Sequence, residues 1–146
     1  MHTFLLVHGP NLNLLGEREP EIYGRGTLSD LEEDLGIYAR DRGVSLLCRQ
    51  SNHEGELIDF IHKNAGIAEA ALINAGAFSH TSIALRDALL ATRLCFIEVH
   101  ISNVFAREEY RRKSYLADIA IGVITGLGTK GYRYAFDYLL TRAEGL

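Results

Sequence analysis

Residues 4–7 read FLLV, a run of four apolar side chains, and the polar turn HGPN follows at once at residues 8–11. A short apolar run that ends in glycine and proline predicts a buried β-strand. Further strands are predicted from the apolar runs at residues 44–48, 70–73, 94–101 and 119–124. The sequence therefore predicts five strands spread along the chain.

Segments with a helical pattern lie between these runs. The clearest begins near residue 29 and places Leu31, Leu35 and Tyr38 on one face. Other predicted helices cover residues 54–64 and 81–91, a short stretch near 107–114, and a last segment that begins near residue 130. Alternation of strand and helix predicts an α/β three-layer sandwich with a parallel sheet, most simply in the flavodoxin-like strand order 2-1-3-4-5.

Composition and charge are those of an ordinary globular protein. The 146 residues are 47% hydrophobic and 23% charged, which suits one domain spanning residues 1–146. A formal net charge of −4 argues against general binding to nucleic acid or to an acidic membrane. Cys48 and Cys95 lie far apart in apolar stretches, and no basic, apolar leader is present at the start, so we expect free thiols and a cytoplasmic protein.

The connection between the first strand and the first helix is unusually long. It runs over residues 9–27, whereas most such connections have about two to six residues. Its composition favours a lid over an active site, because it combines prolines and glycines with the polar side chains Asn11, Asn13, Arg18 and Tyr23.

Polar side chains follow three of the predicted strands. Asn11 comes after the first strand, Asn74 to Thr81 after the third, and Glu98, His100 and Ser102 within and after the fourth. In a doubly wound sheet the ligand crevice lies beyond the carboxyl ends of the strands, so these groups should meet at one rim. We expect His80 and Thr81 to begin a helix whose free N–H groups favour a carboxylate. The basic run at residues 107–113 either adds a cation or is a solvated helix face.

Two pairs of residues suggest acid–base chemistry. Glu98 and His100 are two apart on a strand and so face the same side, where the carboxylate can orient the imidazole and favour its charged form, unless the pair is merely structural. Tyr23 alone is an ordinary tyrosine. Arg18 beside it would lower the pKa of the phenol from about 10 toward neutrality, a change worth roughly 4 kcal/mol in a closed site.

Two common kinds of site are disfavoured. Residues 126–131, GLGTKG, match a dinucleotide-binding pattern, but too few residues follow for the returning strand and its ribose-binding acid. The histidines at positions 2, 8, 53 and 62 form no compact set of metal ligands. The many polar side chains expected at the rim, with no obvious metal-binding pattern, suggest acid–base chemistry on a small, oxygen-rich anion.

The loop sequence HGPNLNLLGEREPEIYG at residues 8–24 resembles the signature loop of the type II 3-dehydroquinate dehydratases. Further segments resemble the family in the same order and spacing, at residues 50–57, 74–88, 98–103 and 128–132. The resemblance covers nearly the whole chain. It departs at His8, where the family often has Asn, and at Ser79, where it often has Thr.

The resemblance implies a flavodoxin-like subunit, trimers assembled into a dodecamer, and reversible dehydration of 3-dehydroquinate to 3-dehydroshikimate in aromatic biosynthesis or quinate breakdown. It implies no cofactor and no Schiff base. Tyr23 would be the base and Arg18 would lower its pKa. Asn11 would hold a water at the enolate oxygen. His100 would protonate the departing hydroxyl, with Glu98 as its orienting partner.

The same resemblance implies which residues bind the substrate. These are Asn74, His80 and Arg111, the backbone amides of Ile101 and Ser102, and Asp87 at a trimer contact beside a neighbour's site. The alternative is a noncatalytic flavodoxin-like protein that kept the pocket to bind a ligand or a partner. Such a binder would have no need of Arg18 and Tyr23 together with His100.

Overall fold

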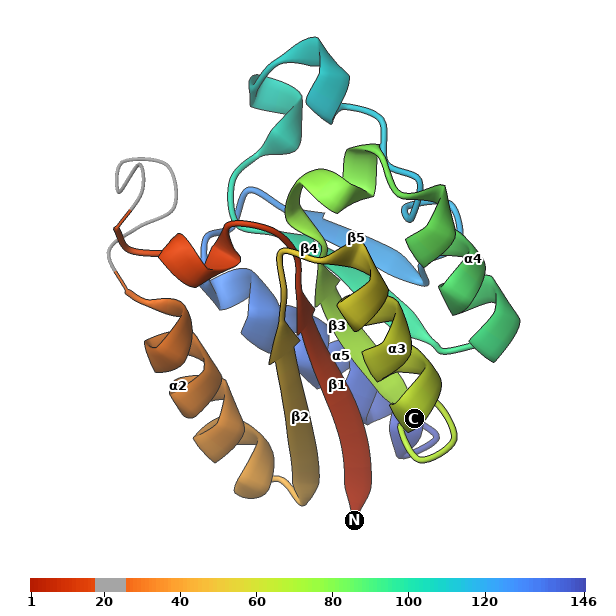
Figure 1. The fold of residues 1–146 in the computed structure, drawn as a ribbon. Helices are drawn as coiled ribbons and strands as arrows, with labels where there is room; N and C mark the ends of the chain where they lie inside the picture. The colour runs from red at the N-terminus through yellow and green to blue at the C-terminus, as the bar shows by residue number, and fades with distance from the viewer. Residues whose placement is uncertain (18–25) are drawn as a thin grey trace.

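A computed structural model describes residues 1–17 and 26–146. Its centre is a parallel sheet with the strand order β2-β1-β3-β4-β5, which confirms the predicted order and fold class (Figure 1). The strands are β1 (His2–His8), β2 (Val44–Gln50), β3 (Ala70–Asn74), β4 (Phe96–His100) and β5 (Gly122–Thr125).

Helices cover both faces of the sheet. They are α2 (Leu28–Arg40), α3 (Glu54–Asn64), α4 (Ile83–Thr92) and α5 (Lys130–Ala143). The apolar faces of α2 and α5 pack with Phe4 and Leu6 of β1, whereas those of α3 and α4 pack with Leu5 and Val7. In Figure 1, α3 lies in front of the sheet and α5 behind it. Alternate residues of each central strand therefore enter two separate apolar cores.

The helix predicted at residues 81–91 begins later than expected. A 3₁₀-helix, η2 (Gly76–His80), follows β3, and α4 starts at Ile83 with Ser82 as its N-cap. The Ser82 hydroxyl accepts a hydrogen bond from the Leu85 N–H at 2.9 Å. The prediction that His80 and Thr81 open this helix is therefore wrong, because the backbone N–H groups of Thr81 and Ser82 donate to the Phe78 carbonyl instead.

Other boundaries also differ from the prediction. Within the run at 94–101, only β4 forms a strand. The strand predicted at 119–124 is β5, which begins later because the N–H groups of residues 119 and 120 donate to the Leu116 carbonyl. The stretch near 107–114 is not one helix: it contains the 3₁₀-helix η4 (Glu109–Arg111), and another, η3 (Val104–Ala106), ends just before it. Arg107, extended between them, interrupts the helical backbone. None of the helices in the described part of the chain is long and apolar enough to cross a membrane.

The ends of β1 and β3 approach each other very closely at Gly9. Its N–H donates to the Asn74 carbonyl at 2.8 Å, and a Cβ at this position would lie 1.9 Å from the Ala75 carbonyl oxygen. That contact is with backbone, so no side-chain movement relieves it. Only glycine fits here.

We therefore expect Gly9→Ala to lower the free energy of unfolding by more than about 3 kcal/mol, because the strand ends must separate to admit the methyl group. Urea denaturation followed by circular dichroism measures it. Gly55→Ala in α3 is the matched control, since its Cβ would meet nothing within 4 Å. Equal stability of the two variants would contradict the argument.

Candidate active site

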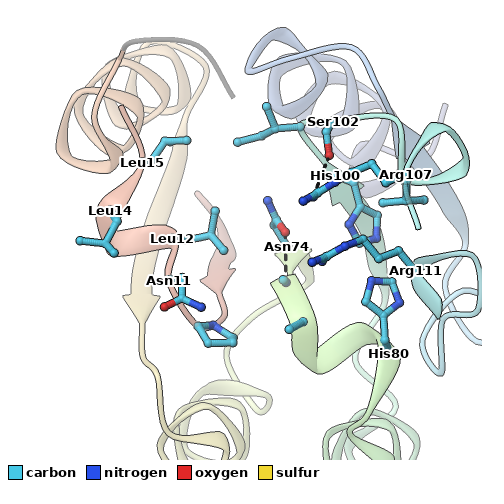
Figure 2. Close-up of a pocket in the computed structure, with 15 residues that line it drawn as sticks. Asn11, Leu12, Leu14, Leu15, Asn74, His80, His100, Ser102, Arg107 and Arg111 are labelled. Atoms are coloured by element: carbon cyan, nitrogen blue, oxygen red, sulfur yellow. Dashed lines mark hydrogen bonds between the residues drawn. The ribbon is translucent and has the colours of Figure 1, made fainter. Parts of the chain in front are cut away.

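A cleft of about 720 Å³, part of it open solvent, lies at the carboxyl ends of β1, β3 and β4. It brings together these residues expected from the sequence: Asn11, Asn74, His80, His100, Ile101, Ser102 and Arg111. In Figure 2, the segment that carries Asn11 forms one wall, the two histidines and two arginines form the other, and Asn74 lies between them.

Two predicted residues in the described part of the chain, Glu98 and Asp87, do not line this cleft. Glu98 lies behind His100, and Asp87 is exposed on α4. Arg18 and Tyr23 fall at positions 18–25, outside the described residues.

Asn11 is held in an unusual backbone conformation. Its φ of 68° lies in the left-handed region, which asparagine tolerates better than most residues. The Asn11 N–H donates to Asn52 Oδ1 at 2.9 Å, and the Gln50 amide donates to Asn52 Oδ1 at 3.2 Å and to the Gly9 carbonyl at 3.1 Å. Side chains at the end of β2 and just beyond it thus fix the turn that presents Asn11 to the cleft.

His100 and Glu98 form a buried hydrogen-bonded pair. The distance from His100 Nε2 to Glu98 Oε2 is 2.6 Å, and the two residues are 6% and 1% exposed. They face the same side of β4, as their spacing predicts. Because Nε2 is held by the carboxylate, Nδ1 is the ring nitrogen left for a ligand. A histidine held in this way has a fixed ring orientation, which suits a proton donor.

His80 packs against this pair. Its ring stacks on that of His100 with centroids 6.3 Å apart and an interplanar angle of 16°. His80 Nδ1 lies 2.7 Å from the Lys113 carbonyl, which can only accept, so Nδ1 carries a proton. Nε2 of His80 is then the nitrogen left for a ligand.

Two arginines make the same wall positive. Arg107 Nη1 lies 3.5 Å from Ser102 Oγ, and Arg111 Nε donates to Glu108 at 2.7 Å. A hydrogen bond from its own backbone, together with the Arg111 guanidinium, lowers the pKa of the Glu108 carboxyl. Both arginines line the cleft, so it can receive an anion.

The described ranges hold no cluster of three His, Cys, Asp or Glu side chains that could bind a metal ion. The fixed groups around the cleft are amides, imidazoles, a hydroxyl and guanidinium groups.

A family model described as dehydroquinase class II matches residues 2–140. The chain belongs to the class II dehydroquinase family. The resemblance seen in the sequence, and the enzyme class that it implies, are confirmed.

Relatives in this family match the chain almost end to end. "Catabolic 3-dehydroquinase 2" of Aspergillus flavus is 56% identical over 146 residues, covering 100% of this chain and 97% of that protein. "3-dehydroquinate dehydratase" of Prochlorococcus marinus strain MIT 9211 is 54% identical, covering 97% and 99%. The crystal structure of the type II dehydroquinase from Propionibacterium acnes superposes with a TM-score of 0.92 at 42% identity, covering 97% of each chain.

Two features of the site were not predicted from the sequence: Arg107 in the wall of the cleft and a buried polar network behind Asn74. The basic run did not reveal which arginine besides Arg111 lines the cleft, because the run does not form one helix and Arg107 is extended between η3 and η4.

The network joins His8, Tyr132 and Asn74. Asn74 Oδ1 accepts the Gly76 N–H at 3.2 Å, so its amide nitrogen must be the atom that donates to the Tyr132 hydroxyl at 2.9 Å. That hydroxyl lies 2.9 Å from His8 Nε2. Burial raises the pKa of Tyr132 and lowers that of His8 from 6.5 to about 3. The support behind Asn74 is therefore uncharged at neutral pH.

The neutrality of His8 has a consequence for stability. The unfolded chain binds a proton at His8 below pH 6.5, whereas the folded chain binds it only near pH 3. Keeping His8 neutral therefore costs no stability above pH 6.5, and the free energy of unfolding decreases as the pH falls from 6.5 toward 3. The loss reaches at most about 1.4 kcal/mol per pH unit.

We expect the stability difference between the wild type and His8→Asn to shrink as the pH falls below 6.5, because asparagine does not titrate. Urea unfolding at a series of pH values measures this difference. Imidazole resonances of His8 that stay neutral down to pH 4 would agree with it. A stability difference independent of pH would contradict it.

Proposed function

We propose that this chain catalyses the reversible dehydration of 3-dehydroquinate to 3-dehydroshikimate through an enolate, without a cofactor. The family membership and the names of the relatives supply the substrate. The observation that supports the mechanism is the buried Glu98–His100 pair, which presents one imidazole nitrogen to a cleft lined by arginines.

The substrate is a carboxylate with several hydroxyls and a ketone, and the cleft offers a partner for each kind of group. Arg111 pairs with the carboxylate. Asn74, His80 and the backbone amides of Ile101 and Ser102 bind the hydroxyl and carboxylate oxygens. Arg107, on the same wall as Arg111, adds positive charge to the cleft.

The chemistry is an anti elimination of water. The Tyr23 phenolate, stabilised by Arg18, takes the C2 proton, and the electrons of that bond form the enolate. A water held by Asn11 donates to the enolate oxygen. His100 then gives its proton to the C1 hydroxyl, which leaves as water while the enolate electrons form the C1–C2 double bond. Transfer of one proton from Tyr23 to His100 through solvent restores the starting state.

We also propose that the chain assembles into trimers, and the trimers into a dodecamer, which is the catalytic assembly. Asp87 is exposed on α4 and lines no part of its own chain's described cleft, as expected of a residue that serves a neighbour's site.

We expect the wild type to convert 3-dehydroquinate into a product with the ultraviolet absorbance of a conjugated enone, and Tyr23→Phe to lower kcat by about 10²- to 10⁴-fold because the base is lost. Calorimetry should show that Tyr23→Phe still binds the substrate. Tyr138→Phe is the control, since this tyrosine is exposed on α5. Binding without turnover by the wild type would support the noncatalytic alternative, and full turnover by Tyr23→Phe would exclude it as the base.

We also expect borohydride added during turnover to leave the enzyme active, since no imine forms. The chain has three lysines, Lys63, Lys113 and Lys130, and none is among the described residues that line the cleft. Residual activity after borohydride, with and without substrate, measures this. Irreversible inactivation that requires substrate would mean that a lysine imine forms.

A further inference from the structure

Ser114 lies behind the Glu98–His100 pair, on the segment that joins η4 to β5. Its Oγ is 2.6 Å from Glu98 Oε1, the carboxylate oxygen that His100 does not use. Ser114 is half-buried and is not among the residues that line the cleft. Among the predicted site residues, its hydroxyl hydrogen-bonds Glu98.

The direction of this hydrogen bond is fixed by the backbone around Ser114. The N–H groups of Leu116 and Ala117 both donate to Ser114 Oγ, at 3.1 and 3.2 Å. A hydroxyl has one proton and two acceptor sites, so the proton of Ser114 is left to donate to Glu98 Oε1. Glu98 thus accepts from Ser114 with one oxygen and holds His100 with the other.

The segment that carries Ser114 is itself anchored. The Tyr115 N–H donates to the Ser79 carbonyl at 2.7 Å, and Arg86 of α4 donates to the Tyr115 carbonyl at 2.8 Å. Arg86 also forms an ion pair with Asp118. These contacts set the position of Ser114 from the α4 side of the sheet.

We infer that Ser114 is a positioning residue for the acid step: its hydroxyl fixes the orientation of the Glu98 carboxylate, which in turn fixes the His100 ring. Both oxygens of a buried carboxylate need partners, and one that lost a partner would rotate or admit water. The effect of Ser114 on turnover rests on the proposed function, whereas its effect on the geometry of Glu98 does not.

The rival explanation is that Ser114 only caps the turn at residues 116 and 117. Three variants separate the two roles. Ser114→Ala removes both the cap and the donor, and Ser114→Thr keeps both. Ser82→Ala removes only a cap, because the Ser82 hydroxyl accepts from the backbone of α4 and the structure gives it no bond to Glu98.

We expect Ser114→Ala to lower kcat about tenfold with KM within about twofold of the wild type, as for loss of a hydrogen bond to a charged group. Ser114→Thr should restore most of kcat, and Ser82→Ala should keep it within about twofold. In a Glu98→Gln background, Ser114→Ala should have less than about a twofold further effect, because Ser114 acts through the carboxylate. Effects of Ser114→Ala and Glu98→Gln that multiply independently would overturn the proposal.

A crystal structure of Ser114→Ala tests the geometry without turnover. We expect the Glu98 carboxylate to rotate or its distance to His100 Nε2 to lengthen from 2.6 Å. An unchanged pair would overturn the proposal. If the wild type has no dehydratase activity, the proposed function fails while this structural test still decides the role of Ser114.

Discussion

The contact between Gly9 and the Ala75 carbonyl is the constraint on which the site depends. It brings the ends of β1 and β3 together at the point where the strand order reverses, and a parallel α/β sheet opens a crevice there. Asn11 lies two residues after Gly9, and Asn74 directly precedes Ala75. Backbone packing therefore brings the two residues to the same end of the sheet, and hydrogen bonds to the side chains of Asn52 and Tyr132 then hold them.

The alternation of side chains along the strands divides the support of the site between the two faces of the sheet. His8 and Asn74 point toward the α2 and α5 face, where Tyr132 of α5 joins them. Glu98 and His100 lie in register with Phe96, on the α3 and α4 face, where Ser114 holds the carboxylate. Asn74 and His100 thus each have a buried polar partner behind them, which limits their motion without occupying the cleft.

Most of the fold was predictable because it depends on patterns with a short period. Apolar runs and helical spacing give the strands, the helices and the sheet order, and a two-residue spacing places Glu98 beside His100. The features that could not be predicted from the sequence depend on contacts between distant segments. Tertiary packing decides three such features: that Ser82 rather than His80 caps α4, that Arg107 lines the cleft, and that Ser114 contacts Glu98. Residues 50–52 matched the family, yet their hydrogen bonds to the Asn11 turn appear only once β1 and β2 are paired.

The buried groups behind the cleft differ in charge between the two faces of the sheet. This difference suits an elimination that removes a proton on one side and delivers one on the other. The α5 side is neutral, because burial keeps His8 uncharged and Tyr132 protonated. The α4 side holds a carboxylate and an imidazole, and the arginines lie on the same wall of the cleft. The proposed acid belongs to this charged side. The proposed base, Tyr23, belongs to the connection between β1 and α2. In the proposed mechanism, acid and base therefore come from different parts of the chain, β4 and the connection between β1 and α2.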